Sequence, residues 1–196
     1  HVSGHGRLAL EHGIPVSIHP AAAPSFSFDP LEDDDELRVG DVSLRCVHTP
    51  GHRPEHCCLT VIDRSRADEP WLVLTGDSLF VGDAARPDLA VDALEGAEGL
   101  FHSLQRLLEL PDGVEVFPGH VAGSLCGKSM SSRGSSTIGF ERRFNPSLAV
   151  GLEEIRVDLL HLVNASSGET NLEELAAAAN AAGDDPVLDD ENQLAF

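Results

Sequence analysis

Apolar and polar residues alternate in short runs through most of the chain before residue 120, which is the period of half-buried β-strands. Pro, Gly and Asp separate these runs, so each run has the length of one strand. A glycine-aspartate pair at Gly40-Asp41 joins two of the runs and predicts a hairpin. The predicted strands are residues 15–18, 37–39, 42–47, 57–62, 71–74 and 114–117.

A helical period replaces this alternation elsewhere, in stretches that glycine or proline brings to an end. The predicted helices are residues 7–12, 93–110, 148–163 and 171–182. The expected loops are residues 20–30, 80–89 and the serine- and glycine-rich 121–139. Antiparallel strands come first and strands that alternate with helices follow, so we expect an α+β domain in which helices cover a sheet.

Composition narrows the class of protein. The 196 residues are 41% apolar, which is enough for one domain with a core. A net charge of −20 repels nucleic acid and anionic membrane, so we expect neither as a partner. The chain begins with neither Met nor a signal-peptide pattern, and we expect residues to be missing before His1.

The four cysteines lack any C-x-x-C spacing, which excludes a zinc ribbon and a thioredoxin-type motif. Cys57 and Cys58 fall in an apolar strand pattern, and we expect buried thiols there. Reduced thiols indicate a cytoplasmic protein.

Three predicted strands end in a residue type that binds metals. The three ends read Thr49-Pro50-Gly51-His52, Thr75-Gly76-Asp77 and Pro118-Gly119-His120. Each alone is typical of a surface histidine or an ordinary turn. Because the pattern occurs three times, and imidazole and carboxylate are both metal ligands, we predict a metal site at the rim of the sheet.

These three motifs, in this order, resemble the metallo-β-lactamase fold, a four-layer αββα sandwich. The hallmark of that family is an H-x-H-x-D-H motif, followed in many members by V-S-G. The opening residues His1-Val2-Ser3-Gly4 resemble the end of this motif. The resemblance covers residues 1–148 and implies an N-terminally truncated domain, with helices at 149–183 packing on the same domain and an acidic tail at 184–196.

Within that family the chain resembles the persulfide dioxygenases, especially those fused to rhodanese domains. The segments that carry this resemblance are residues 75–89, 118–130 and 135–146. Glyoxalase II, the nearest relative, shares the three ligand motifs but is not expected to carry the R-P-D-L or G-S-L-C-G-K stretches. Ala85 and Val121 depart from the pattern, since glycine usually stands at both positions.

The resemblance implies one Fe(II) per chain, with zinc as the alternative metal. His52 and Asp77 match two of its ligands, and the remaining histidine ligand would precede His1. His1 and His120 match residues that complete the second site of two-metal relatives. The implied reaction oxidises a glutathione-type persulfide with O2 to sulfite and thiol, in a possible homodimer.

Two further residues are candidates for binding the substrate. Arg86 suits bidentate binding of a substrate carboxylate, although a structural ion pair with Asp88 explains it equally well. Cys126 lies in a polar, glycine-flanked loop and is expected either to line the pocket or to exchange sulfur. We assign the other histidines to surface or packing roles and single out His56, because it shares the His52 turn.

Two other functions compete with the dioxygenase. Thioester hydrolysis of the glyoxalase II kind would use two metal ions and a bridging hydroxide, and it would require His1 and His120 as ligands. A truncated member that binds no metal and serves as an interaction domain is the non-enzymatic alternative. The missing first half of the H-x-H-x-D-H motif favours that alternative.

Overall fold

The computed structural model describes residues 4–87, 93–149 and 151. The chain forms two compact units, His1–Val150 and Gly151–Phe196, and the description below concerns the first. His1, Asp88, the tail at 184–196 and almost all of the two helices predicted after residue 147 lie outside the described residues.

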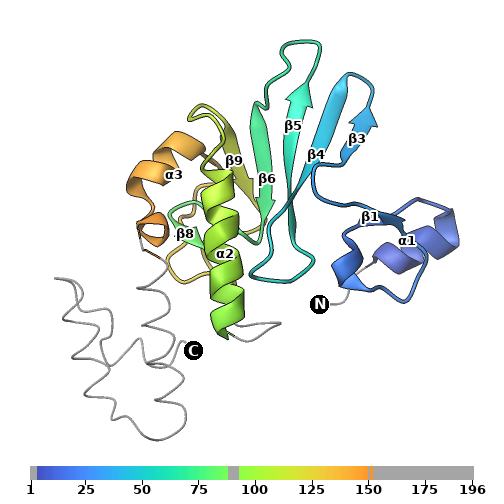
Figure 1. The fold of residues 1–196 in the computed structure, drawn as a ribbon, viewed down its shortest axis with the longest axis horizontal. Coiled ribbons are helices and arrows are strands. Elements are labelled where there is room, and N and C mark those ends of the chain that lie inside the picture. Colours follow the sequence, from blue (N-terminus) through green and yellow to red (C-terminus); the bar gives the residue numbers. More distant parts are fainter. Residues whose placement is uncertain (1–3, 88–92, 150, 152–196) are drawn as a thin grey trace, which may run out of the picture. The chain divides into compact units, whose positions relative to one another are not determined.

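A six-stranded sheet is the centre of this unit, with strand order β10-β9-β6-β5-β4-β3. Its strands are β3 (Glu36–Val39), β4 (Val42–His48), β5 (Cys57–Asp63), β6 (Leu72–Gly76), β9 (Glu115–Pro118) and β10 (Ser136–Thr137). Strands β3 to β6 are successive antiparallel neighbours, whereas β9 lies parallel to β6. Figure 1 shows β6, β5, β4 and β3 side by side. The predicted hairpin and all of these strands except β10 match the pattern in the sequence.

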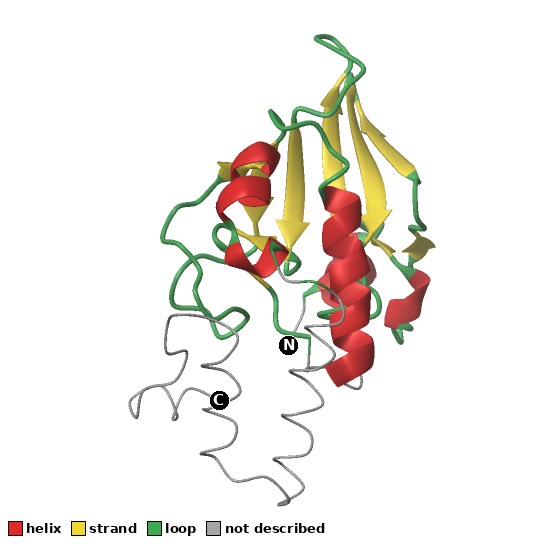
Figure 2. Ribbon diagram, turned by 60° about the vertical axis from the view of Figure 1, so that its left-hand side comes forward, coloured by secondary structure: helices red, strands yellow, loops and turns green. Residues whose placement is uncertain are grey.

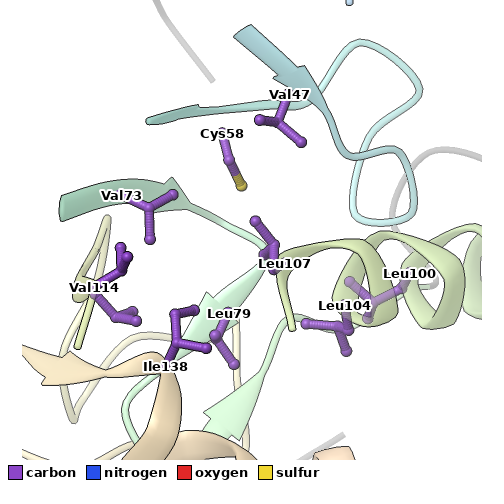
Figure 3. Close-up of a cluster of buried hydrophobic side chains, with 10 residues drawn as sticks. Val47, Cys58, Val73, Leu79, Leu100, Leu104, Leu107, Val114 and Ile138 are labelled. Carbon is purple, nitrogen blue, oxygen red and sulfur yellow. The ribbon is translucent and has the colours of Figure 1, made fainter. Parts of the chain in front are cut away.

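One face of the sheet is covered by α2 (Ala93–Leu107) and α3 (Ile138–Phe144). Both helices lie on the same side of the strands in Figure 2. Their apolar side chains meet those of the sheet in a single core, of which Figure 3 labels nine members. The buried residues of this core are Val47, Cys58, Val73, Leu79, Leu100, Leu104, Leu107, Val114, Val116 and Ile138.

The other face of the sheet also carries apolar residues, because alternate positions of each strand point to it. Leu44 and Leu59 are half-buried there, and Leu74 is 41% exposed. An apolar face of this kind is what a sheet offers to a second sheet in a sandwich. The described residues therefore supply one large sheet and its helices, which is half of the layers in the predicted four-layer sandwich.

Residues before β3 form a small substructure of α1 (His5–His12), β1 (Ser17–Ile18), the 3₁₀ turn η1 (Pro20–Ala22) and β2 (Asp29–Pro30). Helix α1 ends at Gly13 as predicted. Strands β1 and β2 pair in parallel, so part of the predicted 20–30 loop is regular structure. The rings of His19 and His48 stack 3.9 Å apart and join this substructure to β4.

Three further segments differ from the sequence-based expectation. The predicted 80–89 loop contains part of a hairpin, β7 (Leu79–Phe80) with β8 (Asp83–Ala84), whose two-residue strands are too short to show alternation. Residues 136–144 form β10 and α3 although a loop was expected at 121–139 and no element at 140–144. Glu141 in α3 is fully buried, so a charged residue stands where a helical pattern needs an apolar one. A 3₁₀ turn, η2 (Pro146–Leu148), lies where the helix at 148 was expected to begin.

Within the described ranges, every helix is too short or too polar to cross a membrane.

Candidate metal centre

The turn that carries His52 is packed directly on helix α2. Gly51 has a φ of +143°, and a Cβ at this position would lie 2.5 Å from the backbone of Leu100. Only glycine combines this conformation with so close an approach. Ser103 of the same helix donates a hydrogen bond of 2.7 Å to the carbonyl of Pro50. The proline and glycine of the T-P-G-H motif therefore pack the turn against α2 and fix the backbone position of His52.

The imidazole of His52 is buried, with only 3% of the residue exposed. Its Nδ1 lies 3.0 Å from the carbonyl oxygen of Arg86, so Nδ1 carries the proton that this acceptor requires. Nε2 faces Asp77, whose Oδ2 lies 3.4 Å away, and in the neutral ring it is the nitrogen with a lone pair to offer. A backbone carbonyl that holds one ring nitrogen is a common way of orienting a metal-binding histidine.

Asp77 lies between two histidines. Strands β6 and β9 are parallel neighbours, so Asp77 and His120, which follow them, reach the same edge of the sheet. Nε2 of His120 lies 3.1 Å from Oδ1 of Asp77, opposite the oxygen that faces His52. The amide of Gly119 donates 2.8 Å to the carbonyl of Gly76 and holds the two turns together. The three predicted strand ends thus meet at one place.

The two substrate candidates lie beside this group. Cys126 is half-buried, and its Sγ and one ligand atom each of His52 and Asp77 all lie within 4.8 Å of one another. The backbone of Arg86 connects them, because its amide donates 3.0 Å to the carbonyl of Cys126 and its carbonyl accepts from His52. His1 lies outside the described residues, as does Asp88, the proposed ion-pair partner of Arg86.

A buried carboxylate, Asp83, organises the loop that carries Cys126. Its Oδ2 accepts hydrogen bonds of 2.6 Å from the amides of both Lys128 and Ser129. Its Oδ1 accepts one of 3.1 Å from the hydroxyl of Ser147. Sequence reasoning did not single out Asp83, and an acidic residue after a glycine in a predicted loop is ordinarily a solvated turn residue.

The donor set fits a metal ion. The contact of Nδ1 with a carbonyl directs Nε2 of His52 toward Asp77, and both carboxylate oxygens face an imidazole. Imidazole and carboxylate are ligands that iron and zinc share. His52, Asp77 and His120 are therefore the described residues that could hold the metal, with Cys126 beside them.

Similar folds occur in solved structures, although no family model matches the chain. A metallo-β-lactamase from Staphylococcus aureus superposes with a TM-score of 0.73 and 28% identity, over 81% of this chain and 49% of that one. The chain belongs to the metallo-β-lactamase superfamily. A second member, ETHE1 from Myxococcus xanthus, superposes with a TM-score of 0.65 and 26% identity, over 93% of this chain and 70% of that one.

The relatives found by sequence similarity include uncharacterized proteins and probable hydrolases. An uncharacterized protein of Mycobacterium tuberculosis is 33% identical over 70% of this chain. A probable hydroxyacylglutathione hydrolase of Schizosaccharomyces pombe is 28% identical over 77% of it. The chain spans 57% of the length of the mycobacterial relative and 62% of the yeast one. The fold and the superfamily predicted from the strand-end motifs are confirmed.

Proposed function

We propose that this superfamily member is the metal-binding part of a non-haem Fe(II) persulfide dioxygenase. It would oxidise a glutathione-type persulfide with O2 and water, giving sulfite and the free thiol. The observation that carries the proposal is the meeting of His52, Asp77 and the Cys126 thiol at one edge of the sheet. Similarity to ETHE1, a persulfide dioxygenase, across nearly the whole chain supports it.

The protein residues bind and orient in this proposal, and none acts as a nucleophile. His52 would bind the metal through Nε2, because its Nδ1 is held by a carbonyl, and Asp77 would contribute the negative charge. An iron held by two histidines and one carboxylate on one face supplies open coordination positions and redox chemistry. Zinc remains the alternative occupant, because it accepts the same ligands.

Arg86 and Cys126 would contact the persulfide. The half-buried Arg86 has a planar guanidinium that suits a carboxylate of the glutathione part. Cys126 lies close enough to the ligands for its thiol to border the substrate sulfur. The four cysteines lie in the described part and are all free thiols, so we place the reaction in the cytoplasm.

Thioester hydrolysis of the glyoxalase II kind is the second candidate, and one observation favours it. Asp77 directs one oxygen toward His52 and the other toward His120, which is the arrangement of a carboxylate shared between two metal ions. The yeast relative named as a probable hydroxyacylglutathione hydrolase supports this reading.

Metal content and oxygen uptake separate these candidates. The chain, extended upstream of His1 to include an H-x-H-x-D-H motif, would be purified without air and analysed for metals. The dioxygenase requires about one iron per chain, together with oxygen uptake and sulfite formation when glutathione persulfide is added. Two metal ions with cleavage of S-lactoylglutathione and no oxygen uptake would replace it by the hydrolase. A protein without any metal would overturn both and favour the non-catalytic alternative.

A further inference from the structure

His56 connects the two turns that carry His52 and Asp77. It lies at the end of the turn that follows β4, directly before β5. Its Nε2 accepts a hydrogen bond of 2.9 Å from the backbone amide of Asp77. Its Nδ1 lies 2.8 Å from the hydroxyl of Thr49, at the start of the same turn. One half-buried ring therefore contacts both turns.

These contacts determine where the ring proton lies. A backbone amide can only donate, so Nε2 of His56 must be the unprotonated nitrogen. A neutral ring then carries its proton on Nδ1 and donates it to the Thr49 hydroxyl. Burial lowers the pKa of His56 and favours this neutral ring, although Asp77 opposes the shift.

The hydrogen bonds continue beyond Thr49 and lead back to the turn that carries Asp77. The Thr49 oxygen lies 3.2 Å from Sγ of Cys58, and that thiol donates to the carbonyl of Thr75 over 3.5 Å. Burial raises the pKa of Cys58 to about 12, so the thiol keeps the proton that it donates. Each of the four groups in this path can therefore donate one hydrogen bond to the next. The path therefore closes from Thr75 through Cys58, Thr49 and His56 to Asp77.

Gly76 lets the turn lie against the ring. Its φ is +50°, and a Cβ at this position would lie 2.7 Å from Nε2 of His56. A side chain there would push the ring away from the Asp77 amide that it accepts from. The glycine of the T-G-D motif thus leaves the space in which the His56 ring reaches the Asp77 amide.

We propose that His56 is a positioning residue that holds Asp77 in ligand geometry by accepting its backbone amide. The proposal rests on the metal role of Asp77, and His56 itself would not touch the metal. Groups that orient a metal ligand typically change metal affinity by about 10- to 100-fold when they are removed. Removal of the His56 ring is expected to weaken metal binding by a factor in that range.

The first test needs no metal. Long-range ¹H–¹⁵N spectra of the metal-free full-length protein should show His56 as the Nδ1–H tautomer. The Asp77 amide should exchange slowly in the wild type and in His56→Gln, whose side-chain oxygen can still accept from it. It should exchange faster in His56→Asn, which can reach Thr49 but not Asp77. An Nε2–H tautomer, or equal exchange in both variants, would overturn the proposal.

The second test measures affinity for Zn²⁺ by competition with a chromophoric chelator. His56→Asn should bind about 10- to 100-fold more weakly than wild type, and His56→Gln should recover most of the loss. His102→Gln, which alters an exposed histidine on α2, is the matched control and should bind as wild type does. Equal affinity of all four proteins would contradict the positioning role while leaving the metal site in place. A wild type that binds no Zn²⁺ would instead contradict the proposed function, and the exchange data would still decide the role of His56.

Discussion

The metal-ligand rim and the loop that faces it are held in different ways. The rim consists of the turns at 49–56 and 75–78, which the side chains of Thr49, His56 and Cys58 join. Thr49 bonds to both His56 and Cys58, and these two side chains bond to the backbone of Asp77 and Thr75. The serine–glycine loop, residues 121–135, is held chiefly through its backbone. Its anchors include Asp83, the carbonyl of Val81, which accepts from Ser131, and the amide of Arg86.

This difference separates two properties of the site. Metal binding depends on side chains that support one another, so a change at one position should spread to the others. The position of Cys126 depends on Asp83, a carboxylate that accepts from the Lys128 amide 45 residues later in the sequence, so it can be altered without disturbing the rim. Arg86 joins the two regions, because its backbone bonds to both.

Asp77→Asn should have the largest effect on the rim. The amide keeps the volume of the side chain but loses the charge and one acceptor, and the loss should exceed the roughly 100-fold seen for residues that merely orient a ligand. Competition titration with Zn²⁺ measures it. Asp68→Asn removes an exposed carboxylate and should leave the affinity unchanged. Unchanged Zn²⁺ affinity in Asp77→Asn would show that the rim does not bind the metal.

Asp83→Ala should release the serine–glycine loop while sparing the rim. Two amides would lose their acceptor, at a cost of about 1–3 kcal/mol in the free energy of unfolding. Iodoacetamide should then label Cys126 faster than in the wild type, whereas Cys46 and Cys58 stay unlabelled because burial raises both pKa values to about 12. Zn²⁺ affinity should hold. If affinity falls together with stability, the loop and the rim are a single unit.

Gly76→Ala should disturb the rim from its backbone. A left-handed conformation costs an alanine about 1–2 kcal/mol, and its Cβ would also meet the His56 ring. Urea unfolding should show the loss, and Zn²⁺ affinity should fall with it. Gly134→Ala is the control, since a Cβ there has nothing within 4 Å. Wild-type affinity in Gly76→Ala would mean that the His56 contact does not govern the ligand.

Cys126→Ser should have the smallest effect on the metal. A change outside the ligand set usually alters binding by no more than about 0.5 kcal/mol, or roughly twofold. The KM for the persulfide should rise instead, because the thiol borders the substrate in the proposed reaction. A large loss of Zn²⁺ affinity would show that the thiol is itself a ligand, and the rim and the loop would then form one centre.

Local patterns were sufficient for much of the fold. The β3–β4 hairpin and the strands β5, β6 and β9 follow from alternation and from the turn residues between them. Helix α2 follows from the helical spacing of its apolar residues, although it ends at Leu107 and not at residue 110. The short hairpin β7–β8 and the helix α3 were not predicted, because their stability comes from distant partners. Glu141 and Asn145 illustrate this, since their side chains bond across the chain to Gly82 and Asp83.

The strand-end motifs likewise gave three residues of the site but not their supports. His52, Asp77 and His120 each follow a strand and a turn, which is a signal within four residues. His56 has no such signal, since a histidine after a turn looks the same whether it lies on the surface or accepts from an amide 21 residues later. Its place in the His52 turn was the one hint.

By itself, the sequence determined the strands, the main helix and the residue types at three strand ends, because these depend on local period and on Pro and Gly. It also determined the superfamily, because the T-P-G-H, T-G-D and P-G-H motifs occur in order. Only the tertiary structure decided which nitrogen of His52 and of His56 bonds to the backbone. It alone brought Cys126 to the ligands, because both depend on hydrogen bonds between segments far apart in the chain.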